Sequence, residues 1–201
     1  MSDFPIALHG ERIKAVIVGG GAVGARKARA LIDAGAQVTI VAPDVVEEIE
    51  QAERLRQVAV VREEYDRDHI KSANLVIAAT SSRDVNAQIA VDAQANGQLV
   101  NITDYPDEGN FHTMALHRSG DITIAVSSGG VPGAAARIRD AIAERFDSRY
   151  ERAVSMLRGL RARSLARGDD RWQDAATRLL DSDFCNSVEN GTFADKADSW
   201  G

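Results

Sequence analysis

Residues 14–43 read KAVIVGGGAVGARKARALIDAGAQVTIVAP: an apolar run, a glycine cluster, a helical pattern and a second apolar run. Residues 14–21 predict a strand that ends in glycines, and 22–35 predict a helix that Gly35 terminates. Residues 36–43 predict a second strand. Continuous apolar strands joined by a helix are typical of a βαβ unit, in which a parallel sheet is covered on both faces.

The same alternation continues along the chain. Further helices are expected at 45–57 and 83–97, and further strands at 58–65, 73–81 and 98–103. Five strands alternating with helices predict a Rossmann-like, doubly wound α/β domain over residues 1–110.

The pattern changes after residue 110. The segment GDITIAVSSGG (120–130) alternates as a half-exposed antiparallel strand would, and 131–146 predict a helix. Residues 147–201 predict an arginine-rich, C-terminal helical region whose polar end is frayed. The expected apolar contacts of this region are Val154, Leu157, Leu160, Leu165, Trp172, Ala176, Leu179 and Leu180.

The composition argues against several classes of protein. The chain has 201 residues and a formal net charge of −6, whereas a nucleic-acid surface needs a basic patch. No stretch approaches the roughly 20 apolar residues of a membrane span, and the start does not resemble a signal peptide. A single cysteine, Cys185, cannot form an internal disulfide. We therefore expect a cytoplasmic protein that binds neither nucleic acid nor membrane.

The glycine cluster predicts a dinucleotide site. Gly19, Gly21 and Gly24 match G-x-G-x-x-G between a predicted strand and a predicted helix. In that context Gly19 permits the tight turn, Gly21 lets the backbone approach a pyrophosphate, and Gly24 lets the helix pack on the sheet. The helix N-terminus then presents N–H groups and a positive dipole end to the phosphates. A merely structural glycine turn is the alternative.

The residues after the second strand indicate which dinucleotide binds. An acid is expected about 20 residues after the glycines, where Ala42 and Pro43 stand and Asp44 follows. No Lys or Arg lies in 41–46 to hold a 2′-phosphate. The sequence therefore favours NAD over NADP.

A carboxylate ends the fifth predicted strand. In LVNITDYP (99–106) the apolar run stops at Asp104, at the carboxyl edge of the sheet where ligands of parallel α/β folds bind. A carboxylate there can take a proton while a hydride leaves a substrate, if it comes within roughly 2.6–3.2 Å. The alternative is a turn residue before Tyr105 and Pro106.

Five segments carry a family resemblance in their order and spacing: FPIAL, VIVGGGAVGARKARALIDAGAQVTIVAP, LVIAATSSRDVNAQIA, VNITDYPDEGNF and GDITIAVSSGG. Over residues 4–146 they resemble the precorrin-2 dehydrogenase/sirohydrochlorin ferrochelatase module, the N-terminal part of sirohaem synthases. The resemblance implies NAD-dependent oxidation of precorrin-2 to sirohydrochlorin in sirohaem biosynthesis, by a homodimer. Some members also insert Fe²⁺ into the product, so a ferrochelatase (lyase) activity is a second expectation.

The resemblance also implies roles for single residues. Asp104 is expected to be the catalytic carboxylate, with residues 111–146 as a dimerisation and substrate-cleft segment. The expected cofactor contacts are Gly19, Gly21, Ala22, Val23, Gly24, Pro43 and Asp44. The expected substrate contacts are Asn110, His112 and Ser128, and no metal ligand is expected.

Two alternatives stay open. Residues 112–115 and 131–133 depart from the family pattern near the expected cleft. These departures leave open a non-catalytic NAD- or tetrapyrrole-binding regulator of the same fold. The presence of Asp104 argues against that alternative. An unrelated Rossmann dehydrogenase or an NAD-binding channel-regulatory domain would not explain the SSGG segment (127–130) and the segment after residue 104.

Overall fold

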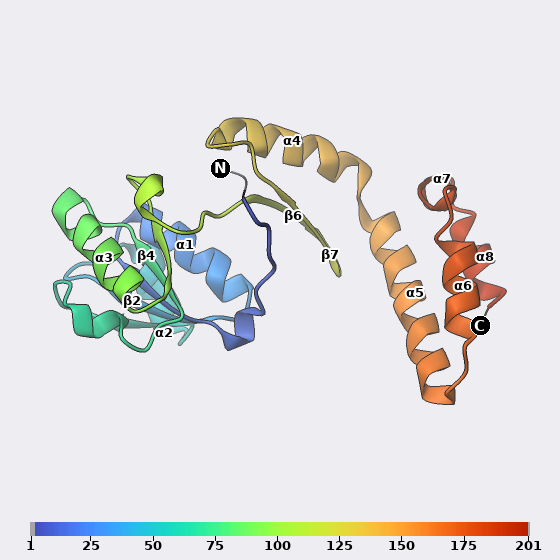
Figure 1. Cartoon of the computed structure of the whole chain (residues 1–201), viewed down its shortest axis with the longest axis horizontal. Coiled ribbons are helices and arrows are strands. Elements are labelled where there is room, and N and C mark those ends of the chain that lie inside the picture. Colours follow the sequence, from blue (N-terminus) through green and yellow to red (C-terminus); the bar gives the residue numbers. More distant parts are fainter. Residues whose placement is uncertain (1–2, 201) are drawn as a thin grey trace. The chain divides into compact units, whose positions relative to one another are not determined.

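A computed structural model of the chain describes residues 3–200, which form two compact units divided between His112 and Thr113 (Figure 1). The strands of the first unit are β1 (Lys14–Val18), β2 (Gln37–Val41), β3 (Val58–Val61), β4 (Leu75–Ala78) and β5 (Leu99–Ile102). Its helices are α1 (Ala22–Asp33), α2 (Glu47–Arg54) and α3 (Arg83–Ala95), with 3-10 turns at Gly10–Arg12, Arg67–Ile70 and Pro106–Glu108.

The five strands form one parallel sheet in the order β3-β2-β1-β4-β5. This confirms the Rossmann-like, doubly wound sheet. The chain runs outward from β1 to β3 on one side and returns to β4 on the other, so the strand order reverses between β1 and β4. Ligands of such sheets bind at this reversal, outside the carboxyl ends of the strands.

The alternating side chains of the strands are buried against two helical layers. Ile17 of β1 packs on one face with Ala28 of α1 and Ile49 of α2. Val16 packs on the other face with Ile89 of α3. Figure 1 shows α1 and α3 on opposite sides of the strands. Burial of each such aliphatic side chain contributes roughly 1.5–3 kcal/mol to the free energy of folding. The two helical layers therefore hold the carboxyl edge of the sheet in place.

The second unit begins with a two-stranded antiparallel hairpin. The hairpin consists of β6 (Ala115–Ser119) and β7 (Ile122–Val126). The helices of the second unit are α4 (Pro132–Arg145), α5 (Ser148–Arg167), α6 (Arg171–Leu179), α7 (Phe184–Glu189) and α8 (Phe193–Asp198). Burial alternates along β7, as expected for a half-exposed strand, and β7 pairs with β6. No strand is predicted from the sequence at β6, because its five residues, ALHRS, alternate over too short a stretch. None of the helices described is long and apolar enough to cross a bilayer.

The helices α5 to α8 enclose an apolar core of their own. Leu157, Leu160 and Leu179 are buried there, as expected. Leu165 and Leu180 are 60% and 49% exposed, so their expected apolar contacts are not formed. The chain end also differs from the expected frayed tail, because α7 and α8 bury the side chains of Val188, Phe193 and Ala197.

Glu189 joins α7 to α4 and α5, and this predicts a pH dependence. It accepts a hydrogen bond from the Tyr150 hydroxyl at 2.6 Å and pairs with the Arg145 Nε at 2.7 Å. Both contacts lower the pKa of the Glu189 carboxyl in the folded chain, and the hydrogen bond from Tyr150 has the larger effect. Its contribution to stability is therefore present above the unfolded pKa, near 4.5, and is lost as the pH falls through the lower folded value.

The substitution Glu189→Gln is expected to lower the stability of the second unit at pH 7 and to reduce the further loss between pH 5 and pH 3. Urea unfolding followed by tryptophan fluorescence measures this, because both tryptophans of the chain, Trp172 and Trp200, lie in that unit. Glu144→Gln is the control, since Glu144 is exposed on α4 and forms no ion pair with another described residue. If stability depended on pH in the same way in both variants, Glu189 would not be the source of the pH dependence.

Candidate functional site

The glycine cluster forms a tight loop between β1 and α1. Gly19 has a positive φ of 122°, and a Cβ on it would lie 2.3 Å from the carbonyl oxygen of Ala79. A Cβ on Gly24 would lie 2.2 Å from the carbonyl oxygen of Gly19, so only glycine lets α1 come this close to the loop. The turn at Gly19 and the close packing at Gly24 that the sequence predicts are therefore present in the structure.

Gly21 differs from the other two glycines of the motif. No atom lies within 4 Å of the position that its Cβ would take, so the backbone here is open to an incoming group. Gly21 caps α1, and no acidic residue stands in the first turn of that helix. An open backbone at a helix N-terminus without a carboxylate is suited to a pyrophosphate. The loop therefore fits the phosphates of a dinucleotide.

The residues next to the loop also lie at the carboxyl edge. Ala22 and Val23 form the exposed first turn of α1. Pro43 and Asp44 follow β2 and are exposed, and the Asp44 carboxylate has no hydrogen bond or ion pair to another described residue. A Cβ on Gly20 would lie 2.1 Å from the Asp44 carbonyl oxygen, so this segment packs directly against the loop. All the predicted cofactor residues thus lie together.

One lysine of α1 is half-buried near this loop. Burial, and then the charge of Arg26, lowers the pKa of the Lys27 ammonium. Arg26 itself is exposed to solvent.

Asp104 follows β5 at the same edge of the sheet, and a buried amide holds it. The Asn86 Nδ2 donates a hydrogen bond to the Asp104 Oδ1 at 3.0 Å. Asn86 is fully buried on α3 and is fixed by Thr80, which follows β4. The Asn86 Oδ1 accepts from the Thr80 hydroxyl at 2.8 Å and from its N–H at 3.2 Å, and the Asn86 Nδ2 also donates to the Thr80 carbonyl at 3.2 Å.

The second carboxylate oxygen of Asp104 faces a cation. The Arg83 guanidinium lies 3.9 Å from the Asp104 Oδ2, too far for a hydrogen bond. Arg83 is itself held by an ion pair with Glu108 and by the ring of Tyr105, whose centroid is 5.0 Å from the guanidinium carbon. The side chain of Asp104 remains 37% exposed. A hydrogen bond therefore fixes the Oδ1, while the side chain as a whole remains partly exposed to solvent.

A continuous set of contacts connects this carboxylate to the glycine loop. Gly19 lies against Ala79, the residue before Thr80, and Thr80 fixes Asn86, which holds Asp104. These residues come from the ends of β1, β4 and β5 and from the start of α3. The structure thus brings the predicted catalytic carboxylate and the predicted cofactor residues to one edge of one unit.

Two asparagines of this region stabilise the backbone. The Asn110 Oδ1 accepts from the Val100 N–H at 2.8 Å, and its Nδ2 donates to the Gln98 carbonyl at 2.9 Å, so its amide pairs with the edge strand β5. The substrate contact of Asn110 stays a prediction. Both the oxygen and the nitrogen of its side-chain amide already have backbone partners. The Asn101 Nδ2 donates to the Phe111 carbonyl at 3.1 Å and so ties the loop after β5 to this strand.

The other two predicted substrate residues lie elsewhere in the chain. His112 ends the first unit, and its Nε2 lies 3.8 Å from an Asp3 carboxylate oxygen. Ser128 belongs to the second unit, where its hydroxyl donates to the Val131 carbonyl in the turn before α4. Gly129 and Gly130 have positive φ values in that turn. Among residues 3–200 no group of three or more His, Cys, Asp or Glu side chains could hold a metal ion.

The sequence patterns do not single out four further residues near this site: Thr80, Arg83, Asn86 and Glu108. One signal was available for Asn86, because it shares a helical face with the buried residues Ile89, Ala90 and Ala93. A polar residue on the apolar face of a helix needs a buried partner. The sequence could not show which partner, since Asp104 is 18 residues away.

Replacement of Asn86 is expected to destabilise the first unit. Asn86→Ala leaves the N–H and the carbonyl of Thr80 without their partner, while the Thr80 hydroxyl keeps its hydrogen bond to the Ser82 carbonyl. A single unsatisfied buried group costs about 1–3 kcal/mol. The midpoint of urea unfolding, followed by circular dichroism, measures the loss. Val91→Ala, at a 62% exposed position of the same helix, is expected to change stability by less than about 0.5 kcal/mol. Equal losses in the two variants would contradict the role given to Asn86.

Comparison with known proteins places the chain among dinucleotide-binding proteins. Residues 6–115 match the family model described as putative NAD(P)-binding. A solved structure described as SirC, precorrin-2 dehydrogenase, matches with a TM-score of 0.77 and 24% identity over 98% of this chain and 100% of that one. This likeness shows a shared fold across both units.

Curated relatives are similar over the whole chain. The siroheme synthase of Chromobacterium violaceum is 32% identical over 199 residues, which cover 96% of this chain and 42% of that protein. Siroheme synthase 3 of Aeromonas hydrophila is 31% identical over 217 residues, covering 100% of this chain and 46% of that protein. The chain therefore spans less than half the length of these relatives.

Proposed function

The chain belongs to the putative NAD(P)-binding family, and from that premise we propose that it oxidises precorrin-2 to sirohydrochlorin with NAD⁺. In this reaction the substrate loses a hydride to NAD⁺ and a proton to a base, giving NADH and H⁺. The names of the relatives, siroheme synthase and precorrin-2 dehydrogenase, support this substrate. The observation that carries the proposal is Asp104, held by Asn86 at the same sheet edge as the open glycine loop.

The bound dinucleotide supplies the hydride acceptor. The backbone at Gly21 and the N-terminus of α1 bind its phosphates, because both are open and free of carboxylates. Asp44, exposed and unpaired after β2, binds the ribose hydroxyls. A carboxylate at this position would repel a 2′-phosphate, and no Lys or Arg stands in 41–46 to compensate. These features support NAD over NADP.

Asp104 acts as the general base. Its Oδ1 accepts the hydrogen bond from Asn86, which fixes the carboxylate, and its Oδ2 takes the substrate proton. Arg83 stands 3.9 Å from the Oδ2 and places a positive charge beside it. Ser128 and His112 are proposed to bind substrate carboxylates, and Asn110 to hold the segment before His112 against β5.

Anaerobic turnover of enzymatically prepared precorrin-2 tests the proposal. NADH formation and the sirohydrochlorin spectrum are expected to rise together with NAD⁺ and to be much slower with NADP⁺. Addition of Fe²⁺, as a substrate, then tests the proposed ferrochelatase step, and light scattering tests the proposed homodimer. Dinucleotide binding without any turnover would contradict the enzyme and favour the regulator of the same fold.

A further inference from the structure

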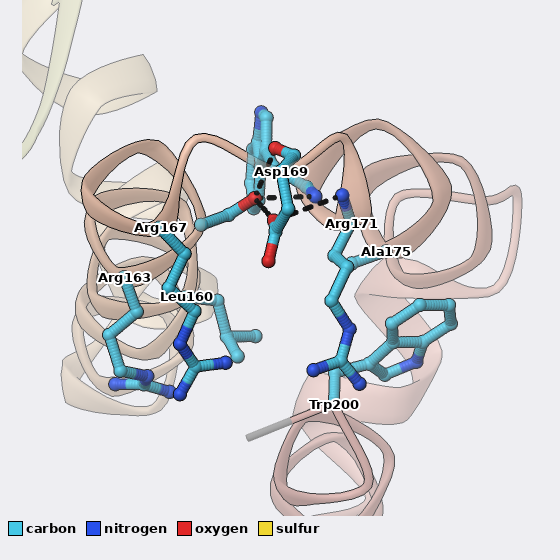
Figure 2. A pocket seen from close by; sticks show the side chains of 9 residues that line it. Leu160, Arg163, Arg167, Asp169, Arg171, Ala175 and Trp200 are labelled. Carbon is cyan, nitrogen blue, oxygen red and sulfur yellow. Dashed lines mark hydrogen bonds between the residues drawn. The ribbon is translucent and has the colours of Figure 1, made fainter.

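An arginine-rich segment of the second unit has no part in the proposed reaction. Residues 158–171 contain five arginines and two aspartates, in a chain whose net charge is −6. Between α5, α6 and the residue Trp200 after α8 lies a shallow, half-open hollow of about 20 Å³, room for about one water molecule, so a larger group would bind at its open mouth. Figure 2 shows Arg163 and Arg167 of α5 and Arg171 of α6 reaching into it from opposite sides. We refer to the space lined by these three arginines and Trp200 as the arginine hollow.

The charges that line the arginine hollow are unbalanced. Asp169 is its only carboxylate among the described lining residues, and its Oδ1 accepts from the Ser164 hydroxyl and from the Arg171 N–H at 3.2 Å. Both hydrogen bonds lower the pKa of the Asp169 carboxyl, and the one from Ser164 has the larger effect. Asp169 is therefore charged at neutral pH. None of the three guanidinium groups forms an ion pair within residues 3–200. Three cations against one anion leave two positive charges in excess.

A bound anion would offset the repulsion between the arginines of α5. Arg163 and Arg167 are four residues apart on α5, and like charges at this spacing destabilise a helix. Arginine guanidinium groups match the paired oxygens of a phosphate or carboxylate, so one such group could bridge α5 and α6. Arg178 stacks on Trp200 at 5.7 Å and fixes the indole as one wall.

We propose that the arginine hollow binds an oxyanion, either a free phosphate or the carboxylate arm of a larger ligand. The oxygens lie between the guanidinium groups of Arg163, Arg167 and Arg171. The proposal does not depend on the dehydrogenase reaction, because this binding involves neither the glycine loop nor Asp104.

Tryptophan fluorescence reports on this site directly, because both tryptophans of the chain, Trp172 and Trp200, line it. Inorganic phosphate is titrated into the full chain against sodium chloride at constant ionic strength. A saturable fluorescence change and a rise in Tm, which follows when a ligand binds only the folded state, are expected with phosphate alone.

Matched variants assign the response to the arginine hollow. Arg167→Gln and Arg171→Gln are each expected to weaken phosphate binding roughly tenfold, the effect of losing one charge-assisted hydrogen bond. Arg161→Gln is the control, since Arg161 is an exposed arginine of α5 that does not line the hollow. Circular dichroism checks that all three variants fold. Equal weakening by Arg161→Gln would show a general charge effect and would overturn the proposal.

A second titration distinguishes the two sources of the oxyanion. Uroporphyrin III, a stable polycarboxylate porphyrin, replaces phosphate, and quenching of tryptophan fluorescence reports its binding. Quenching that Arg167→Gln weakens and Arg161→Gln leaves intact supports a carboxylate arm in the hollow. A phosphate response alone supports the free anion. If neither probe gives a response that depends on Arg167, the proposal is overturned.

Discussion

Replacement of Asp104 by Asn is expected to lower kcat for precorrin-2 oxidation by about 10²–10⁴-fold, the usual contribution of a general base. The amide keeps the shape of the carboxylate and can still accept the hydrogen bond from Asn86. It cannot take a proton, so the loss affects the chemical step. The affinity for the dinucleotide is expected to stay unchanged, because the glycine loop is not altered. Stopped-flow formation of NADH under anaerobic conditions measures the rate.

Asp107 offers a matched control for this experiment. It stands three residues further along the same segment, is exposed, and has no hydrogen bond or ion pair to another described residue. Asp107→Asn removes the same charge and is expected to leave kcat unchanged. If Asp104→Asn keeps wild-type turnover, then Asp104 is only a turn residue, and the proton acceptor must be sought elsewhere. A fall in kcat with KM unchanged would indicate lost transition-state stabilisation.

The fold could be predicted from the sequence because its determinants are local. The apolar strands, the helix that ends before Gly35 and the positive φ of Gly19 and Gly35 depend on residues close in the sequence and on backbone sterics, although Gly19 also packs against the distant Ala79. Each of these features therefore leaves a pattern within a few residues. The same holds for Asp104, whose position at a strand end is visible in the letters LVNITDYP.

The parts that could not be predicted depend on distant partners. Asn86 holds Asp104 across 18 residues, and Arg83 pairs with Glu108 across 25. The chain end looked frayed because its residues are mostly polar, yet Phe193 and Ala197 are buried against α5 and α6. A few apolar residues in a polar segment gain a core only when other helices supply the opposite wall. Single-sequence patterns do not contain that information.

Two substitutions in the glycine loop are expected to have large but different effects, one on the affinity for NAD⁺ and the other on the stability of the first unit. Gly21→Ala is expected to leave the fold intact, since Gly21 has φ −83° and ψ −176° and no atom within 4 Å of the added Cβ. The same Cβ occupies the space that a pyrophosphate needs. We expect the affinity for NAD⁺ to fall at least about tenfold, or about 1.4 kcal/mol, as measured by calorimetry.

Gly19→Ala should instead destabilise the first unit itself. Its φ of 122° is strained for alanine, at about 1–3 kcal/mol, and its Cβ would overlap the Ala79 carbonyl. Gly133→Ala is the control for both variants, because Gly133 has an ordinary φ, open space around its Cβ and a place in the other unit. Thermal unfolding separates lost stability, expected for Gly19→Ala, from lost affinity, expected for Gly21→Ala. Tight NAD⁺ binding by Gly21→Ala would mean that the pyrophosphate does not approach the backbone at this glycine, and the cofactor site would have to be moved from the loop.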